Sequence, residues 1–134
     1  MQPRRRLEAN LRSESKAYGY TLTIWGSGAL LITNGGLPTE MEVFGFAVGA
    51  VFGFALLALV AFGGIFEDVE YASPPSIVVS MIHVVATIGA LGTSDAIVQS
   101  GTVRLVTFFA VGAAATTVYN LLLLVEVWLA RRLA

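Results

Sequence analysis

Four long apolar stretches, separated by short polar segments, make up most of the chain and predict four helices. They cover about residues 18–34, 43–66, 76–93 and 102–129. The shortest of them is near the lower limit of about 17 residues for a helix that crosses a bilayer. Glycine and proline end helices and mark the breaks, as in Gly35-Gly36-Leu37-Pro38. We therefore predict an all-α integral membrane protein, with four transmembrane helices arranged as two hairpins in a small bundle.

The second stretch contains a glycine at every fourth position. Gly45, Gly49 and Gly53 lie inside an unbroken apolar run, and this spacing puts all three on one helix face. In lipid, helices associate where small residues let their backbones approach closely. The three glycines therefore predict a packing face, a glycine zipper. It either packs the second helix within the subunit, which needs no further assumption, or joins two subunits.

The basic residues are distributed unevenly along the chain and predict its orientation. Only Arg104 lies on the side of the outer turns, whereas the two tails together hold Arg4, Arg5, Arg6, Arg12, Lys16, Arg131 and Arg132. The positive-inside rule then places both termini in the cytoplasm and the protein in the cell membrane. Residues 1–17 form a basic segment, either an amphipathic helix on an anionic leaflet or a flexible tail. Residues 18–130 form the transmembrane domain, and 131–134 a basic tail.

The composition of the chain excludes several classes of function but does not point to a particular one. Of the 134 residues, 56% are hydrophobic and 13% charged, about half the charged share of a typical soluble domain. The chain has no cysteine and one histidine, so it lacks the residues for a disulfide or a conventional metal site. No nucleophile or phosphate-loop motif is present, and the basic tail lacks interleaved aromatic residues. We expect no enzyme, no cofactor and no nucleic-acid partner.

Polar side chains within the apolar stretches form the candidate functional site. Ser76, Ser80, His83 and Thr87 share one face of the third helix. With a rise of 1.5 Å per residue, Ser27, His83 and Asn120 each lie roughly 10–14 Å from the cytoplasmic end. This shared depth predicts a polar cluster of three helices. Its members are Ser27, Ser80, His83, Thr87, Thr116 and Asn120.

The cluster has two interpretations. Its side chains either hydrogen-bond between helices, as polar groups in membrane bundles commonly do, or form a proton-sensitive, ion-contacting site around His83. The first interpretation predicts a non-catalytic packing or assembly component in the lipid bilayer, as a homo-oligomer or with a membrane-protein partner. The alternative is an oligomeric channel or transporter for a small ion or solute, with its path at His83 and Asn120.

Three further charged residues lie near the ends of the spans. Arg104 and Asp95 both belong near the outer surface, where the sequence leaves two roles open: they pair across the third hairpin, or they line an outer entrance. Glu126 precedes Trp128 and the two terminal arginines. It is expected at the cytoplasmic interface, where its carboxylate reaches water and a basic neighbour.

Overall fold

A computed structural model describes residues 3–62 and 76–133, with the side chains of 8, 11–16, 61–62, 76–82 and 130 left out. It contains four helices: α1 (Pro3–Gly35), α2 (Glu40–Phe62), α3 (Ser76–Gln99) and α4 (Arg104–Leu133). No strand occurs in the described ranges, so the all-α prediction is confirmed. The predicted end of the second span at residue 66 lies outside them.

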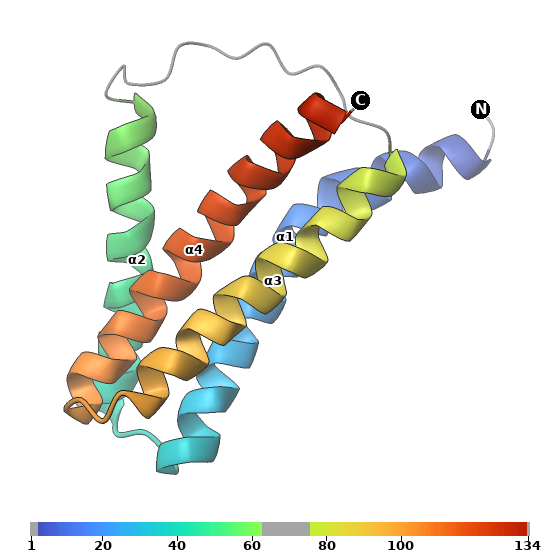
Figure 1. The fold of residues 1–134 in the computed structure, drawn as a ribbon. Coiled ribbons are helices and arrows are strands. Elements are labelled where there is room, and N and C mark those ends of the chain that lie inside the picture. Colours follow the sequence, from blue (N-terminus) through green and yellow to red (C-terminus); the bar gives the residue numbers. More distant parts are fainter. Residues whose placement is uncertain (1–2, 63–75, 134) are drawn as a thin grey trace.

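Three of the four helices form a unit, and the fourth is attached to its side. Helices α1 and α3 lie side by side and α4 packs against both, whereas α2 runs along α4 alone (Figure 1). From that contact α2 diverges from α4 toward its carboxyl end. Consecutive helices α1 and α2 therefore do not pack along each other in the described part of the chain, unlike the predicted first hairpin. The reason is that the small-residue face of α2 fits α4.

Left-handed glycines end two helices where the sequence predicts breaks. Gly36 follows α1 with a φ of 77°, and Gly101 follows α3 with a φ of 74°. The backbone N–H of Gly36 donates a 2.8 Å hydrogen bond to the carbonyl oxygen of Ile32, which caps the helix as glycine commonly does. Both turns lie at one end of the molecule. The amino end of α1 and the carboxyl end of α4 lie at the other (Figure 1).

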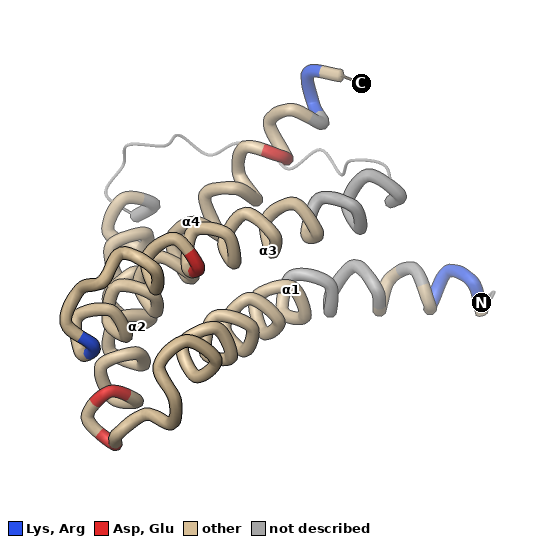
Figure 2. Tube along the Cα trace, turned by 60° about the horizontal axis from the view of Figure 1, so that its bottom comes forward, with Lys and Arg blue, Asp and Glu red and all other residues tan. Residues whose placement is uncertain are grey.

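Helix α1 is longer than a membrane crossing requires. Its 33 residues extend over about 50 Å at 1.5 Å per residue, compared with a hydrocarbon core of about 30 Å. The basic segment is helical from Pro3 and continuous with the first predicted span. In Figure 2, Lys and Arg positions are marked at the free ends of α1 and α4 and again at the opposite end of the molecule. The basic residue at that opposite end belongs to the start of α4, which begins with Arg104.

Two helices are long and apolar enough to cross a membrane. They are α2, over Glu40–Val60, and α4, over Arg104–Leu133, in a search restricted to the described residues. Only 11% of the apolar window of α2 is buried inside the chain. A core helix of a water-soluble protein is mostly buried, so this exposed apolar surface supports a membrane location.

The three glycines of α2 face α4 at close range. A Cβ on Gly53 would lie 2.7 Å from the carbonyl oxygen of Ala113, and one on Gly49 would collide with the carbonyl of Phe109. The contact is mutual, because a Cβ on Gly112 of α4 would collide with the carbonyl of Phe46. A Cβ on Gly45 would lie 3.0 Å from the side chain of Leu105. Glycine at these positions allows the two backbones to touch.

Candidate functional site

A pair of serines joins α1 and α3 in the interior. The side-chain oxygens of Ser27 and Ser94 lie 2.9 Å apart, and either can donate the hydrogen bond. Both residues have 0% of their surface exposed. The pair satisfies each hydroxyl without water, which matters because an unpaired buried hydroxyl destabilises a fold.

A second polar contact joins α1 and α4 nearer the tails. The Tyr20 hydroxyl and the Thr116 side-chain oxygen are 3.0 Å apart, and the rings of Tyr20 and Tyr119 pack with centroids 5.8 Å apart. On α3, Thr87 donates a long hydrogen bond of 3.5 Å to the carbonyl of Gly19. A Cβ on Gly19 would collide with the Tyr119 hydroxyl. Three helices therefore meet around Gly19 and Tyr20.

Small and polar residues at every fourth position form the faces that meet here. On α1 they are Gly19, Thr23 and Ser27, and on α3 they are Ala86, Ala90 and Ser94, all of them buried. The Thr23 hydroxyl donates to the carbonyl of Gly19 within its own helix. From the sequence, Thr23 and Ser27 form a polar pair one turn apart on the first helix. The same spacing rule, applied to the third helix, would also have found Ser94.

The structure brings together only part of the predicted polar cluster. Thr87 and Thr116 converge on neighbouring residues of α1, as described above. Asn120 instead donates a 2.8 Å hydrogen bond to the carbonyl of Thr116 in its own helix. The side chain of Ser80 lies outside the described residues.

Ser27 and His83 do not meet at one level. Ser94, the partner of Ser27, lies eleven residues beyond His83 on α3, about 16 Å along the helix axis. His83 is itself buried, with 7% of its surface exposed. The predicted equal depth of Ser27 and His83 was counted from a first span that begins at Tyr18. Helix α1 instead begins at Pro3, so Tyr18 does not mark a helix end from which depth can be counted.

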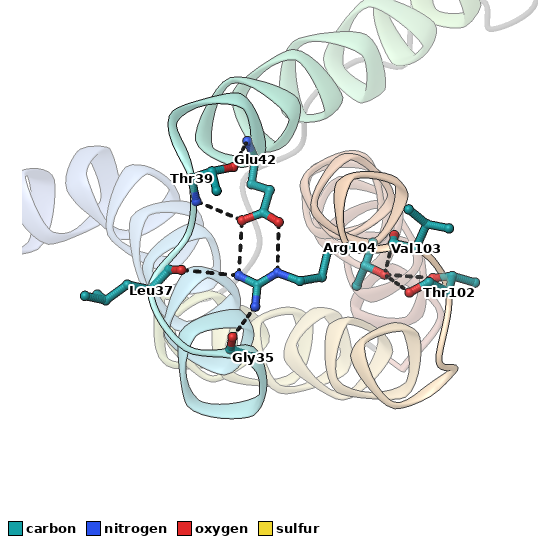
Figure 3. Close-up of polar contacts among 8 residues, drawn as sticks. Gly35, Leu37, Thr39, Glu42, Thr102, Val103 and Arg104 are labelled. Atoms are coloured by element: carbon teal, nitrogen blue, oxygen red, sulfur yellow. Dashed lines mark hydrogen bonds and ion pairs between the residues drawn. The ribbon is translucent and has the colours of Figure 1, made fainter.

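The turns at the opposite end are closed by a polar clasp, made of Thr39, Glu42 and Arg104 with two backbone carbonyls (Figure 3). Nε and Nη2 of Arg104 donate to the two Glu42 carboxylate oxygens at 2.8 and 3.1 Å. Nη1 donates to the carbonyl of Gly35, and Nη2 also reaches that of Leu37 at 3.4 Å. The clasp therefore connects the end of α1 with the starts of α2 and α4.

Glu42 also caps its own helix. Its carboxylate accepts a 2.8 Å hydrogen bond from the Thr39 N–H, and its own N–H donates to the Thr39 hydroxyl at 3.4 Å. This reciprocal pattern is the capping box, with Thr39 before the first helical residue and glutamate three positions later. The spacing of Thr39 and Glu42, three residues apart, can be recognised as a capping box in the sequence.

Two expectations for charged residues were wrong. Arg104 pairs with Glu42 and not with Asp95, which instead accepts a 2.8 Å hydrogen bond from Gln99. Glu126 does not reach water, because only 9% of its surface is exposed. Both of its carboxylate oxygens are buried, and the backbone of Ala86 on α3 lies near them but outside hydrogen-bond geometry.

The remaining chemistry is sparse. Among the described residues, no three His, Asp or Glu side chains gather where they could hold a metal ion. No family model, curated protein or solved structure matches the chain. The function therefore has to be argued from the arrangement of its own residues.

Proposed function

We propose that the chain is a four-span integral membrane protein of the cell membrane, with both termini cytoplasmic, that acts as a non-catalytic assembly component. The observation that carries this proposal is the one-sided attachment of α2. Its glycine face is occupied by α4 of the same chain, and its other faces are apolar and exposed. Because only one face of α2 is covered, its other faces are available within the bilayer for contact with another membrane helix.

The outward face of α2 is suited to a second copy of the chain. Opposite the glycines lie Ala47, Val51, Ala55 and Ala58, of which the first three are exposed. Ala55 and Ala58 are three positions apart and Ala47 lies two turns before Ala55 on the same face; small residues on one face let a second helix approach closely in lipid. In a two-fold assembly this surface would pack against itself.

The hydrogen bonds of the buried polar residues support assembly over conduction. Ser27 and Thr116, two residues of the predicted polar cluster, each make a side-chain hydrogen bond to another helix. The Asn120 side chain donates to the carbonyl oxygen of Thr116 within its own helix. Groups that line a path have to face water or the ion, whereas these face other parts of the chain.

The test uses the absence of cysteine from the natural sequence. We expect Ala55→Cys to form disulfide-linked dimers in membranes under mild oxidation, because the two-fold contact brings the two α2 helices together. The control is Ile88→Cys, an exposed apolar position on α3, which should stay monomeric. Equal dimer yields at the two positions, or none at either, would overturn self-association through α2.

A further inference from the structure

Glu126 is a carboxyl group inside the helix bundle. It lies on α4 with 9% of its surface exposed, and neither carboxylate oxygen has a hydrogen-bond partner among the described residues. Each of those two oxygens exposes less than 1 Å². The group is therefore shielded by the chain itself, and its burial does not depend on the proposed assembly.

The register of α3 against α4 brings His83 to the same level. The two helices run in opposite directions (Figure 1), and Ala90 of α3 packs in one cluster with Tyr119 of α4. Seven residues back along α3 is His83, and seven forward along α4 is Glu126. Ala86, the neighbour of Glu126, is one helical turn from His83. Both buried titratable side chains therefore belong to one layer of this interface.

An ionised carboxylate that has lost its water and has no partner is strongly disfavoured, and such a group neutralises by taking up a proton. Ionisable residues at membrane depth commonly mark proton or ion sites. We propose that Glu126 and His83 form a proton-binding site in the α3–α4 interface, and that the Glu126 carboxyl group holds the proton at neutral pH. The only step is the uptake of one proton by the carboxylate from hydronium in the aqueous phase, which leaves a water molecule.

Within the described part of the chain, the other titratable groups near this layer come from two helices. Helix α4 contributes Tyr119, two turns before Glu126, and Arg131 and Arg132 beyond it; the Arg132 guanidinium lies over the Trp128 ring, 4.5 Å from its centroid. Helix α1 carries Tyr20, whose hydroxyl bonds to Thr116, and, toward its start, Arg12, Glu14 and Lys16, whose side chains are outside the described residues. The described acids of α2, Glu40 and Glu42, belong to the opposite end.

Infrared spectroscopy of the full chain, in a detergent without ester groups, tests the site directly. A protonated carboxyl group has a carbonyl stretch that an ionised carboxylate lacks. At neutral pH we expect this band in the unaltered protein, its loss in Glu126→Gln, and its retention in the exposed control Glu40→Gln. His83→Gln should change the pH at which the band disappears.

Three results would overturn the proposal. They are no band at neutral pH, a band that survives Glu126→Gln, or a pH profile that His83→Gln leaves unchanged. Because glutamine has nearly the shape of a protonated glutamic acid, Glu126→Gln should fold, as circular dichroism and a monodisperse elution profile would show. If it does not fold, Glu126→Asp takes its place and should shift the frequency of the band.

Discussion

Arg104 shows how a single residue can hold three helices at one end of the molecule. It is the first residue of α4, where a positive charge opposes the helix dipole. Its guanidinium is nevertheless fixed by both oxygens of Glu42 and by the carbonyl of Gly35. The Thr39–Glu42 half of the clasp could be predicted from the capping-box spacing. The Arg104 half could not, because 62 residues separate the partners.

We predict that Arg104→Lys lowers the midpoint of thermal unfolding in detergent. Lysine keeps the charge but lacks the planar fork that binds a carboxylate through two parallel hydrogen bonds. The midpoint can be followed by circular dichroism at several salt concentrations. Glu40→Gln removes a nearby exposed charge and serves as the control. An unchanged midpoint for Arg104→Lys would mean that the clasp is only a surface ion pair.

Helices α1, α2 and α3 each pack through small residues at every fourth position. The sequence predicted such a face on α2 from Gly45, Gly49 and Gly53, and left open whether it met the same chain or another. Only the fold could decide, because the complementary Gly112 lies on α4, far along the chain. The similar faces on α1 and α3 were harder to recognise, since threonine, serine and alanine stand at most of their positions and Gly19 is the one glycine named among them.

We predict that Gly49→Ala destabilises the protein by about 1–3 kcal/mol, the usual range for overpacking. The added methyl group collides with the backbone of Phe109, which cannot move as a side chain could. Resistance to unfolding by a denaturing detergent would measure the effect.

The matched control is Gly92→Ala on α3, where an added Cβ meets nothing within 4 Å. Because alanine favours a helix over glycine by about 0.5–1 kcal/mol, this variant should be neutral or more stable. A Gly49→Ala protein as stable as the control would contradict the close α2–α4 contact.

At the scale of the whole molecule, hydropathy and glycine breaks were enough to predict four helices, whereas their packing required the structure. Two helices, α2 and α4, have the length and composition of membrane spans. The sequence suggested sequential hairpins, yet α1 packs with α3 and α4 instead. Hydrophobicity cannot distinguish these arrangements, because lipid is as apolar as the helix surfaces and only small-residue contacts select partners.

We predict that single cysteines will respond to a charged thiol reagent according to the proposed topology. Leu133→Cys, near the carboxyl end, should react only from the cytoplasmic side, and Leu37→Cys, in the first turn, only from the other side. Both positions are about 85% exposed. Ser27→Cys should react from neither side, because its site is closed.

In the proposed topology α2, α3 and α4 each cross the membrane between residues 37 and 133, so the two cysteines lie on opposite sides. Reaction of Leu133→Cys and Leu37→Cys from the same side would contradict this topology. Reaction of Ser27→Cys, in protein that remains folded, would favour a water-filled path. Each protein should be labelled in sealed vesicles of known orientation, with detergent-opened vesicles as the reference for full reactivity.

The side attachment of α2 also affects how the chain is made. A ribosome releases α1 first and α2 next, but among the described helices α1 packs only against α3 and α4. During synthesis, Thr23 can bond to Gly19 within α1, whereas Ser27 lacks Ser94 until the third helix emerges. We therefore expect a nascent chain that ends after α2 to be degraded rapidly, and one that includes α4 to persist. Pulse-chase labelling of the two chains would compare their lifetimes.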